Sequence, residues 1–179
     1  MSAEHINASS AEDSMSKLIT SDTSKYVLDT LDEQGLGMDR EITMPRPSLP
    51  ADITEVDDEG LMRLYTHFSA YSDFVNTQLA CAIIDEKESQ RNIDYAESEA
   101  MLRHQTTNAK TTVTMIKALV DGDPTLGDLR TDALNKYSYR KMLETMANNL
   151  ERSSSVCSRE LTRRTSGDNF KTRSRRFTA

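Results

Sequence analysis

The sequence predicts an all-α fold: a long antiparallel helical hairpin with coiled-coil-like spacing that associates with copies of itself, flanked by disordered N- and C-terminal tails. Two segments carry apolar residues at steps of three and four, as amphipathic helices do. The 179 residues include only 6 Gly and 4 Pro, so most of the chain has few helix breakers. Hydrophobic residues make up 36% and Trp is absent, which suits elongated helices that bury a narrow stripe.

Residues 1–52 are expected to form an acidic disordered leader that ends in a Pro-rich linker. The opening is rich in Ser, Asp and Glu and poor in periodic apolar residues. Within it, "SKYVLDTLDEQG" (24–35) places apolar residues at helical spacing, so a short helix or a docking peptide is an alternative there. The prolines of "MPRPSLP" (44–50) favour an extended, stiff spacer.

The first long helix is predicted from about residue 55 to 105. Thr54 and Asp57 resemble a capping box, and the acidic residues that follow favour a helix N-terminus. Unbroken, this helix would be roughly 75 Å long. Its apolar stripe comprises Leu61, Leu64, Phe68, Tyr71, Val75, Leu79, Ala82 and Ile83. The β-branched residues of 106–120 leave helix and strand both open for the next segment.

The second long helix has the more regular repeat. Asp123 is a plausible N-cap, Pro124 suits the first helical position, and Gly167 is expected to end the helix. Its stripe comprises Leu126, Leu129, Ala133, Lys136, Arg140, Leu143, Ala147, Leu150, Ser154, Cys157 and Leu161. Residues 53–165 therefore form the predicted hairpin and oligomerisation domain, and 166–179 a basic flexible tail. Because a lone hairpin buries one stripe per helix, we expect a homo-oligomeric ring or bundle.

No pattern of an enzyme is present. The sequence lacks phosphate-loop, dinucleotide, zinc-protease and nucleophile-elbow motifs. The three histidines are far apart, and neither Cys81 nor Cys157 has a metal-binding neighbour, so we expect no catalytic residues, no metal and no cofactor. The two cysteines are expected to be reduced. No secretory signal or apolar run long enough for a bilayer is seen, so we expect a cytoplasmic protein without membrane partners.

The charge is divided unevenly along the chain. Residues 1–60 hold 14 acidic and 4 basic residues, whereas residues 150–179 hold three acidic and eight basic ones, in a chain of net charge -7. Part of the basic cluster can complement a helix C-terminus. The remainder fits backbone contacts to single-stranded nucleic acid, with aromatic residues stacking on bases. The candidate residues are Arg159, Arg163, Arg164, Phe170, Lys171, Arg173, Arg175, Arg176 and Phe177.

Four sequence elements together resemble a known family. They are "YSDFVN" (71–76), the bridge "KTTVTMIKALVDGDP" (110–124), "YSYRKMLETM" (137–146) and "SRELTRR" (158–164). This arrangement is similar to the T4-type UvsY recombination mediators of tailed phages. The resemblance covers residues 60–164 and rests on pattern more than identity. It implies a helical ring that binds single-stranded DNA and helps load a RecA-type recombinase onto strands coated with single-strand-binding protein.

The chain departs from that family at one place. The family's basic cluster falls on the latter part of the first long helix, where this chain has "AESEAMLR" (96–103). If the family role holds, DNA contacts move to Lys110, Lys117 and the arginine-rich end. The expected function is therefore phage DNA recombination, repair and replication in the host cell cytoplasm. Two alternatives stay open: a coiled-coil scaffolding protein of a virion, and a small-terminase-like DNA-binding ring.

Overall fold

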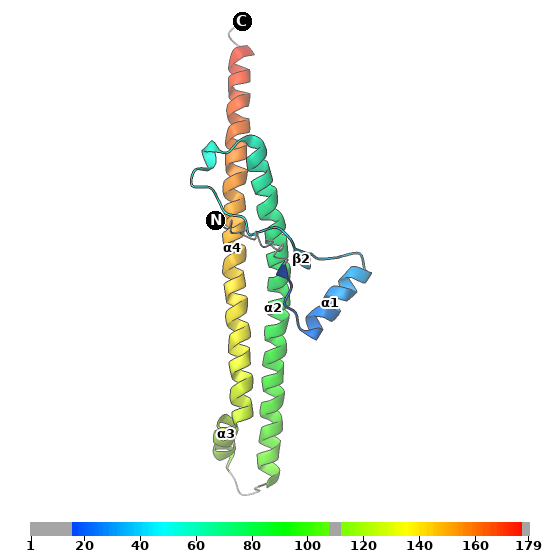
Figure 1. The fold of residues 1–179 in the computed structure, drawn as a ribbon. Helices are drawn as coiled ribbons and strands as arrows, with labels where there is room; N and C mark the ends of the chain where they lie inside the picture. The colour runs from blue at the N-terminus through cyan, green and yellow to red at the C-terminus, as the bar shows by residue number, and fades with distance from the viewer. Residues whose placement is uncertain (1–15, 108–111, 177–179) are drawn as a thin grey trace, which may run out of the picture.

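The computed structural model describes residues 16–107 and 112–176. Two long helices, α2 (Asp58–Thr107) and α4 (Pro124–Arg176), run antiparallel side by side, as Figure 1 shows. The short helix α3 (Val113–Asp121) lies at the turn between them, and α1 (Asp22–Glu33) begins beside α2 and leans away from it. The all-α hairpin predicted from the sequence is confirmed.

The stripe that joins the two long helices has a seven-residue repeat. Along α2 the buried side chains Leu61, Phe68, Val75, Ala82 and Ser89 follow one another at intervals of seven. This spacing, shorter than two full turns of a straight helix, is typical of helices that pack in the manner of a coiled coil. The predicted stripe of α4 is confirmed, because each of its members is buried or partly buried.

One member of the α2 stripe is wrongly assigned by the sequence. Ile83 is 37% exposed, because the adjacent Ala82 takes the position that faces α4. A helix turns about 100° per residue, so Ile83 lies to one side of the seam that Ala82 faces.

Apolar packing between α2 and α4 falls into two clusters with a polar stretch between them. One cluster includes Leu61, Phe68, Leu143 and Leu150, and the other lies at the α3 end of the hairpin. The intervening stretch is joined by three polar contacts between the helices. These are Ser89 to Asp132 at 3.2 Å, Arg130 to Glu97 at 2.8 Å, and the ion pair of Arg140 with Glu86.

The helix ends are fixed by short acidic and hydroxyl side chains. The carboxylate of Asp57 accepts from the backbone N–H of Gly60 at 3.0 Å and so caps α2. The predicted capping box with Thr54 is wrong, because Val56 is extended and ends a separate 3-10 turn, η1 (Ile53–Glu55). Asp123 caps α4 by accepting from Thr125 N–H at 2.9 Å, and Pro124 is the first helical residue, both as predicted.

In the segment 106–120, whose structure the sequence left open, residues 113–120 are helical and belong to α3, while 108–111 lie outside the described residues. Thr112 caps α3 through Met115 N–H at 3.4 Å. Ile116 and Val120, four residues apart, are buried in one cluster with Ala100 of α2 and Leu126 of α4. The β-branched residues are accommodated because one face of this short helix is covered by both long helices, and such packing outweighs intrinsic propensity.

The leader differs from the expectation of disorder over residues 1–52. Residues 16–52 have defined positions, while 1–15 lie outside the described residues. Two short strands, β1 (Ser16–Lys17) and β2 (Glu41–Ile42), pair antiparallel on either side of α1. The short helix that the apolar spacing of residues 24–35 left open is confirmed as α1. The docking of the leader on α2 leaves no hydrophobic pattern because it uses polar groups: Gln78 exchanges two hydrogen bonds with the backbone of Ile19, at 2.8 and 2.7 Å.

The C-terminal end of α4 also differs from its prediction. The helix does not stop at Gly167 but continues to Arg176, so the expected flexible tail is helical over 166–176. A single glycine inside a helix costs only about 1 kcal/mol relative to alanine. No proline follows Gly167, and the cost of one glycine is too small to end so long a helix. Figure 1 shows the last turns of α4 extending past the start of α2.

Candidate nucleic-acid interface

The basic end of the chain lies on a projecting part of α4. Arg164 is level with the start of α2, because it contacts Asp58. The twelve residues from 165 to 176 therefore extend about 18 Å beyond the hairpin, at ~1.5 Å rise per residue. This projection holds four basic residues and one acidic residue, Asp168. The basic residues are Lys171, Arg173, Arg175 and Arg176.

Arg164 has a structural role in this arrangement. Its guanidinium donates to the carbonyl of Val56 and to a carboxylate oxygen of Asp58, both at 2.7 Å, and to the carbonyl of Thr54 at 3.1 Å. A further bond reaches Glu160 at 2.8 Å, and the side chain is only 19% exposed. Its donors are therefore directed to the protein and not to solvent.

Arg163 is paired but accessible. Its guanidinium donates to both carboxylate oxygens of Glu160, at 2.7 and 2.6 Å, and its side chain remains 66% exposed. Glu160 is itself buried between two arginines. Its hydrogen bonds from Arg163 and then Arg164 lower the pKa of the Glu160 carboxyl to about 2. This carboxylate is therefore ionised at neutral pH and cancels part of the positive charge of the two arginines.

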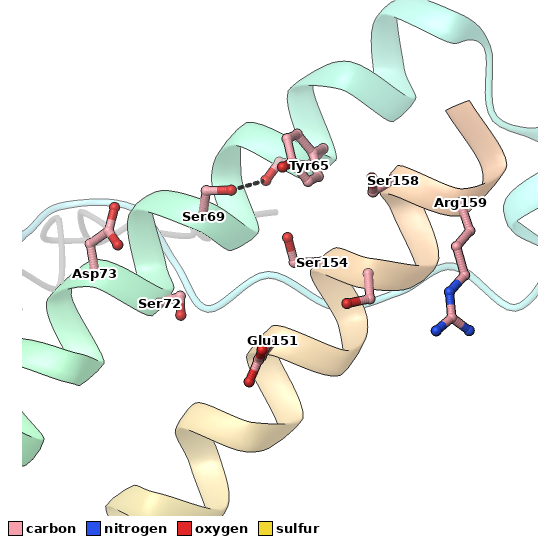
Figure 2. A pocket seen from close by; sticks show the side chains of 9 residues that line it. Tyr65, Ser69, Ser72, Asp73, Glu151, Ser154, Ser158 and Arg159 are labelled. Carbon is pink, nitrogen blue, oxygen red and sulfur yellow. Dashed lines mark hydrogen bonds between the residues drawn. The ribbon is translucent and has the colours of Figure 1, made fainter. Parts of the chain in front are cut away.

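Arg159 lies at one end of a polar groove between α2 and α4. Figure 2 shows hydroxyl groups facing the groove from both helices, with Asp73 and Glu151 toward its other end. The groove has a volume of about 380 Å³. The negative charges of Asp73 and Glu151 would repel a phosphate chain that followed the groove. Only the Arg159 end of the groove is therefore continuous with the basic surface. The hydroxyl-bearing residues are Tyr65, Ser69, Ser72, Ser154, Ser155 and Ser158.

Lys117 is not brought near the arginine-rich end. It is exposed on α3, at the opposite end of the hairpin. Since α2 has 50 residues, the two basic regions are separated by about 75 Å along the rod. Lys110 and Phe177 lie outside the described residues. Phe170 belongs to the projecting turns of α4.

The latter part of α2 carries carboxylates at the place where the resemblance to UvsY-type proteins leads one to look for basic residues. Glu97, which stands in the corresponding part of α2, accepts a 2.8 Å hydrogen bond from Arg130 of α4. Glu99 is paired with Arg103 one turn further along. Glu97 therefore contributes to the pairing of α2 with α4, whereas the Glu99–Arg103 pair lies within α2 itself.

Comparison with known proteins adds no further constraint: no family model, no curated protein and no solved structure matches this chain. Over residues 16–107 and 112–176, no helix is both long enough and apolar enough to cross a membrane. In the same residues, no group of three or more potential metal-ligating side chains is found.

The sequence identified the basic end but did not distinguish its structural arginine from its accessible basic residues. In the sequence, Arg164 looks like the other arginines of the cluster. Its structural contacts become visible only in the fold, where residues 53–58 pack beside this part of α4. The groove hydroxyls were visible as the serine-rich "SSSVC" (153–157), which suggests small residues at a helix contact but no ligand.

Proposed function

We propose that this protein is a non-enzymatic phage recombination mediator. It binds single-stranded DNA without sequence preference and helps load a RecA-type recombinase onto DNA coated with single-strand-binding protein. It acts as a homo-oligomer in the host cell cytoplasm. The observation that carries the proposal is the concentration of basic residues on a helical end that projects about 18 Å from an otherwise acidic body.

The proposed DNA contacts are the accessible part of the basic end. Arg159 and Arg163 are exposed at the level of the hairpin, and the projecting turns continue the positive charge beyond it. Arginines and lysines of this kind hold the phosphate backbone, while Phe170 and Phe177 provide faces on which bases stack. We leave Arg164 out of this set because its donors are engaged within the chain. The projecting contacts are Lys171, Arg173, Arg175 and Arg176.

Self-association strengthens such an interface. Each chain contributes one short cationic end, and several ends on one strand bind together far more tightly than one alone. Exposed apolar side chains on both long helices are consistent with further helix packing between copies. Examples are Leu102 at 62%, Leu134 at 62% and Met142 at 71% exposure.

A salt titration tests this proposal. Replacing the four projecting basic residues by glutamine removes four phosphate contacts and should reduce the slope of log K against log salt by about 3 for oligo-dT, at ~0.7 per contact on single strands. A control variant carries four glutamines at basic residues away from the projection: Lys25, Lys87, Arg91 and Lys141. An equal loss of slope in both variants, or no loss in the first, would remove the projection from the mechanism.

A virion scaffolding protein is the second candidate. The feature that favours it is the length of the two helices, 50 and 53 residues, with apolar side chains exposed along them. It predicts regular assemblies without affinity for oligo-dT. A small-terminase-like reading needs a helix-turn-helix, and residues 16–52 contain the single α-helix α1 followed by extended chain. We do not pursue it.

A further inference from the structure

The polar groove between α2 and α4 carries opposite charges at its two ends. Arg159 lies at one end, Asp73 and Glu151 lie toward the other, and hydroxyl groups lie between them (Figure 2). On α4 the charges are placed evenly about Ser155, because Glu151 precedes it by four residues and Arg159 follows it by four. Each charge is therefore about 6 Å along the helix from Ser155. The groove matches a copy of itself that is turned end for end about this serine.

The charged groups of the groove have no partners within the part of the chain that the structure describes. Asp73, Glu151 and Arg159 are exposed there, and their side chains form no ion pair or hydrogen bond. By contrast, Arg130 and Arg140 of the same helix pair with carboxylates of α2. Glu151 and Arg159 are about 12 Å apart along α4, too far to pair within one helix. Their charges are available to a second molecule.

The groove serines of α4 differ from most hydroxyl residues of the long helices. Thr77 and Ser153, for example, donate to the backbone carbonyl four residues earlier, as is common inside helices. Over residues 16–107 and 112–166, the side chains of Ser154, Ser155 and Ser158 have no such hydrogen bond. Their small size lets another helix approach α4 closely, and their hydroxyls can bond across such a contact.

We propose that α4 of a second copy of this chain crosses α4 in this groove, on a two-fold axis at Ser155. In this arrangement the partner subunit's Arg159 lies against Asp73 and Glu151, and the same cluster forms again on the other side of the axis. Such a contact uses one surface of both subunits and closes as a dimer. A parallel orientation would instead place Arg159 against the partner's Arg159, which like-charge repulsion disfavours.

The charges of the groove favour this occupant over other kinds of molecule. A phosphate chain is repelled by the carboxylates of Asp73 and Glu151. An apolar helix would cover Asp73, Glu151 and Arg159 and leave them without partners, which is costly for buried charges. An inverted second copy gives all three side chains a partner of opposite charge.

This inference rests on the self-association included in the proposed function, and it specifies one interface of that assembly. A two-fold contact joins two copies, so a larger assembly uses further surfaces in addition. The contact covers only a few helical turns, and we expect it to be reversible and to depend on protein concentration. Arg159 contacts DNA, as proposed above, only where this pair opens.

Charge reversal tests the pairing in the full chain without DNA. Arg159→Glu places three carboxylates together at each cluster and should weaken self-association at least about tenfold in sedimentation at several concentrations. The double variant Asp73→Lys/Glu151→Lys should weaken it similarly, since both lysines then face the partner's Arg159. Combining all three reversals recreates opposite charges and should return the association constant to within about threefold of wild type. Arg91→Glu, at an exposed arginine of α2 outside the groove, is the control.

The combined variant decides the outcome. No loss in the Arg159→Glu or the double variant, or a loss that the combined variant does not recover, would overturn the pairing. A lower affinity of Arg159→Glu for oligo-dT with unchanged self-association would assign Arg159 to DNA alone and would also overturn it. The salt titration of the projecting residues does not involve Arg159, so failure of this inference is separate from failure of the proposed DNA binding.

A cysteine on the two-fold axis gives a second readout. Ser155→Cys brings two identical thiols together, within the Cα separation of about 4–7 Å that a disulfide requires, and should form a covalent dimer under mild oxidation. Ser138→Cys, at an exposed residue of α4 outside the groove, should remain mainly monomeric on denaturing gels. The native Cys81 and Cys157 are buried and serve as an internal background. Equal dimer yields for the two variants would contradict an axis at Ser155.

Discussion

The guanidinium of Arg164 and the carboxylate of Asp58 form a 2.7 Å hydrogen bond between residues 106 positions apart. This contact joins the start of α2 to α4 at the point where α4 leaves the hairpin. The same guanidinium binds backbone carbonyls of the segment before α2. One side chain therefore ties three parts of the chain together at the base of the basic projection.

Replacing Arg164 should loosen this junction. Arg164→Ala leaves the carbonyls of Thr54 and Val56 without a donor, and Arg164→Lys cannot restore a planar fork that reaches several acceptors. We expect both variants to lower the melting temperature by several degrees, with lysine rescuing only a minor part. Arg152→Ala, an exposed arginine of the same helix, is the control and should leave the melting temperature nearly unchanged. Thermal unfolding followed by circular dichroism measures the difference.

Glu160 should make stability depend on pH in the acidic range. Arg163 and Arg164 lower its folded pKa from 4.5 to about 2, so the unfolded state binds the proton more readily. The stabilisation is complete above about pH 4.5 and is lost as pH falls from there toward 2. Urea denaturation at several pH values should show a smaller decline for Glu160→Gln than for wild type. Identical pH profiles would contradict the role of this carboxylate.

Phe68 should be among the most sensitive positions of the apolar seam. Its side chain is 2% exposed and packs in the cluster with Leu61 and Leu150. Phe68→Ala creates a cavity and should lower the free energy of unfolding by about 3–5 kcal/mol. Leu134→Ala, at a side chain 62% exposed, should change it by less than about 0.5 kcal/mol. Similar losses for the two variants in urea titrations would mean that the seam is not the main source of stability.

Asp123 should contribute as a helix cap. It accepts from Thr125 N–H at 2.9 Å at the start of α4. Asp123→Ala should reduce the free energy of unfolding by about 1 kcal/mol, and Asp123→Ser should recover most of that loss because serine also caps. Equilibrium denaturation of the three proteins gives the comparison, and a serine variant no better than alanine would argue against capping.

The hairpin could be predicted because the sequence signals of its helices, the apolar repeat and the capping residues, are periodic and local. Steps of three and four along α4 locate the buried face, and Asp123 with Pro124 marks the start of the helix. The short helix at 24–35 was open from its apolar spacing, but the docking of residues 16–42 on α2 could not be predicted in the same way. Its attachment depends on Gln78 and Asp85, polar residues whose partners are about sixty positions away and leave no periodic trace.

The basic end shows a similar limit. Its charge is plain in the sequence, but its helical extension past Gly167 depends on the cooperativity of a helix already 43 residues long at that point. The hydrogen bonds of Arg164 within the chain depend on η1 lying beside this part of α4, which the sequence does not show. Composition therefore located the candidate interface, and only the fold separated its structural arginine from its accessible ones.

The polar middle of the hairpin determines how α2 and α4 are aligned. A stripe with a seven-residue repeat matches its partner almost equally well after a slide of about 10 Å, so apolar burial alone does not choose between alignments. Such a slide would separate Glu86 from Arg140 and Glu97 from Arg130, and both ion pairs between the long helices would be lost. These ion pairs therefore fix the alignment of the two helices, and with it the length of α4 that projects beyond the hairpin.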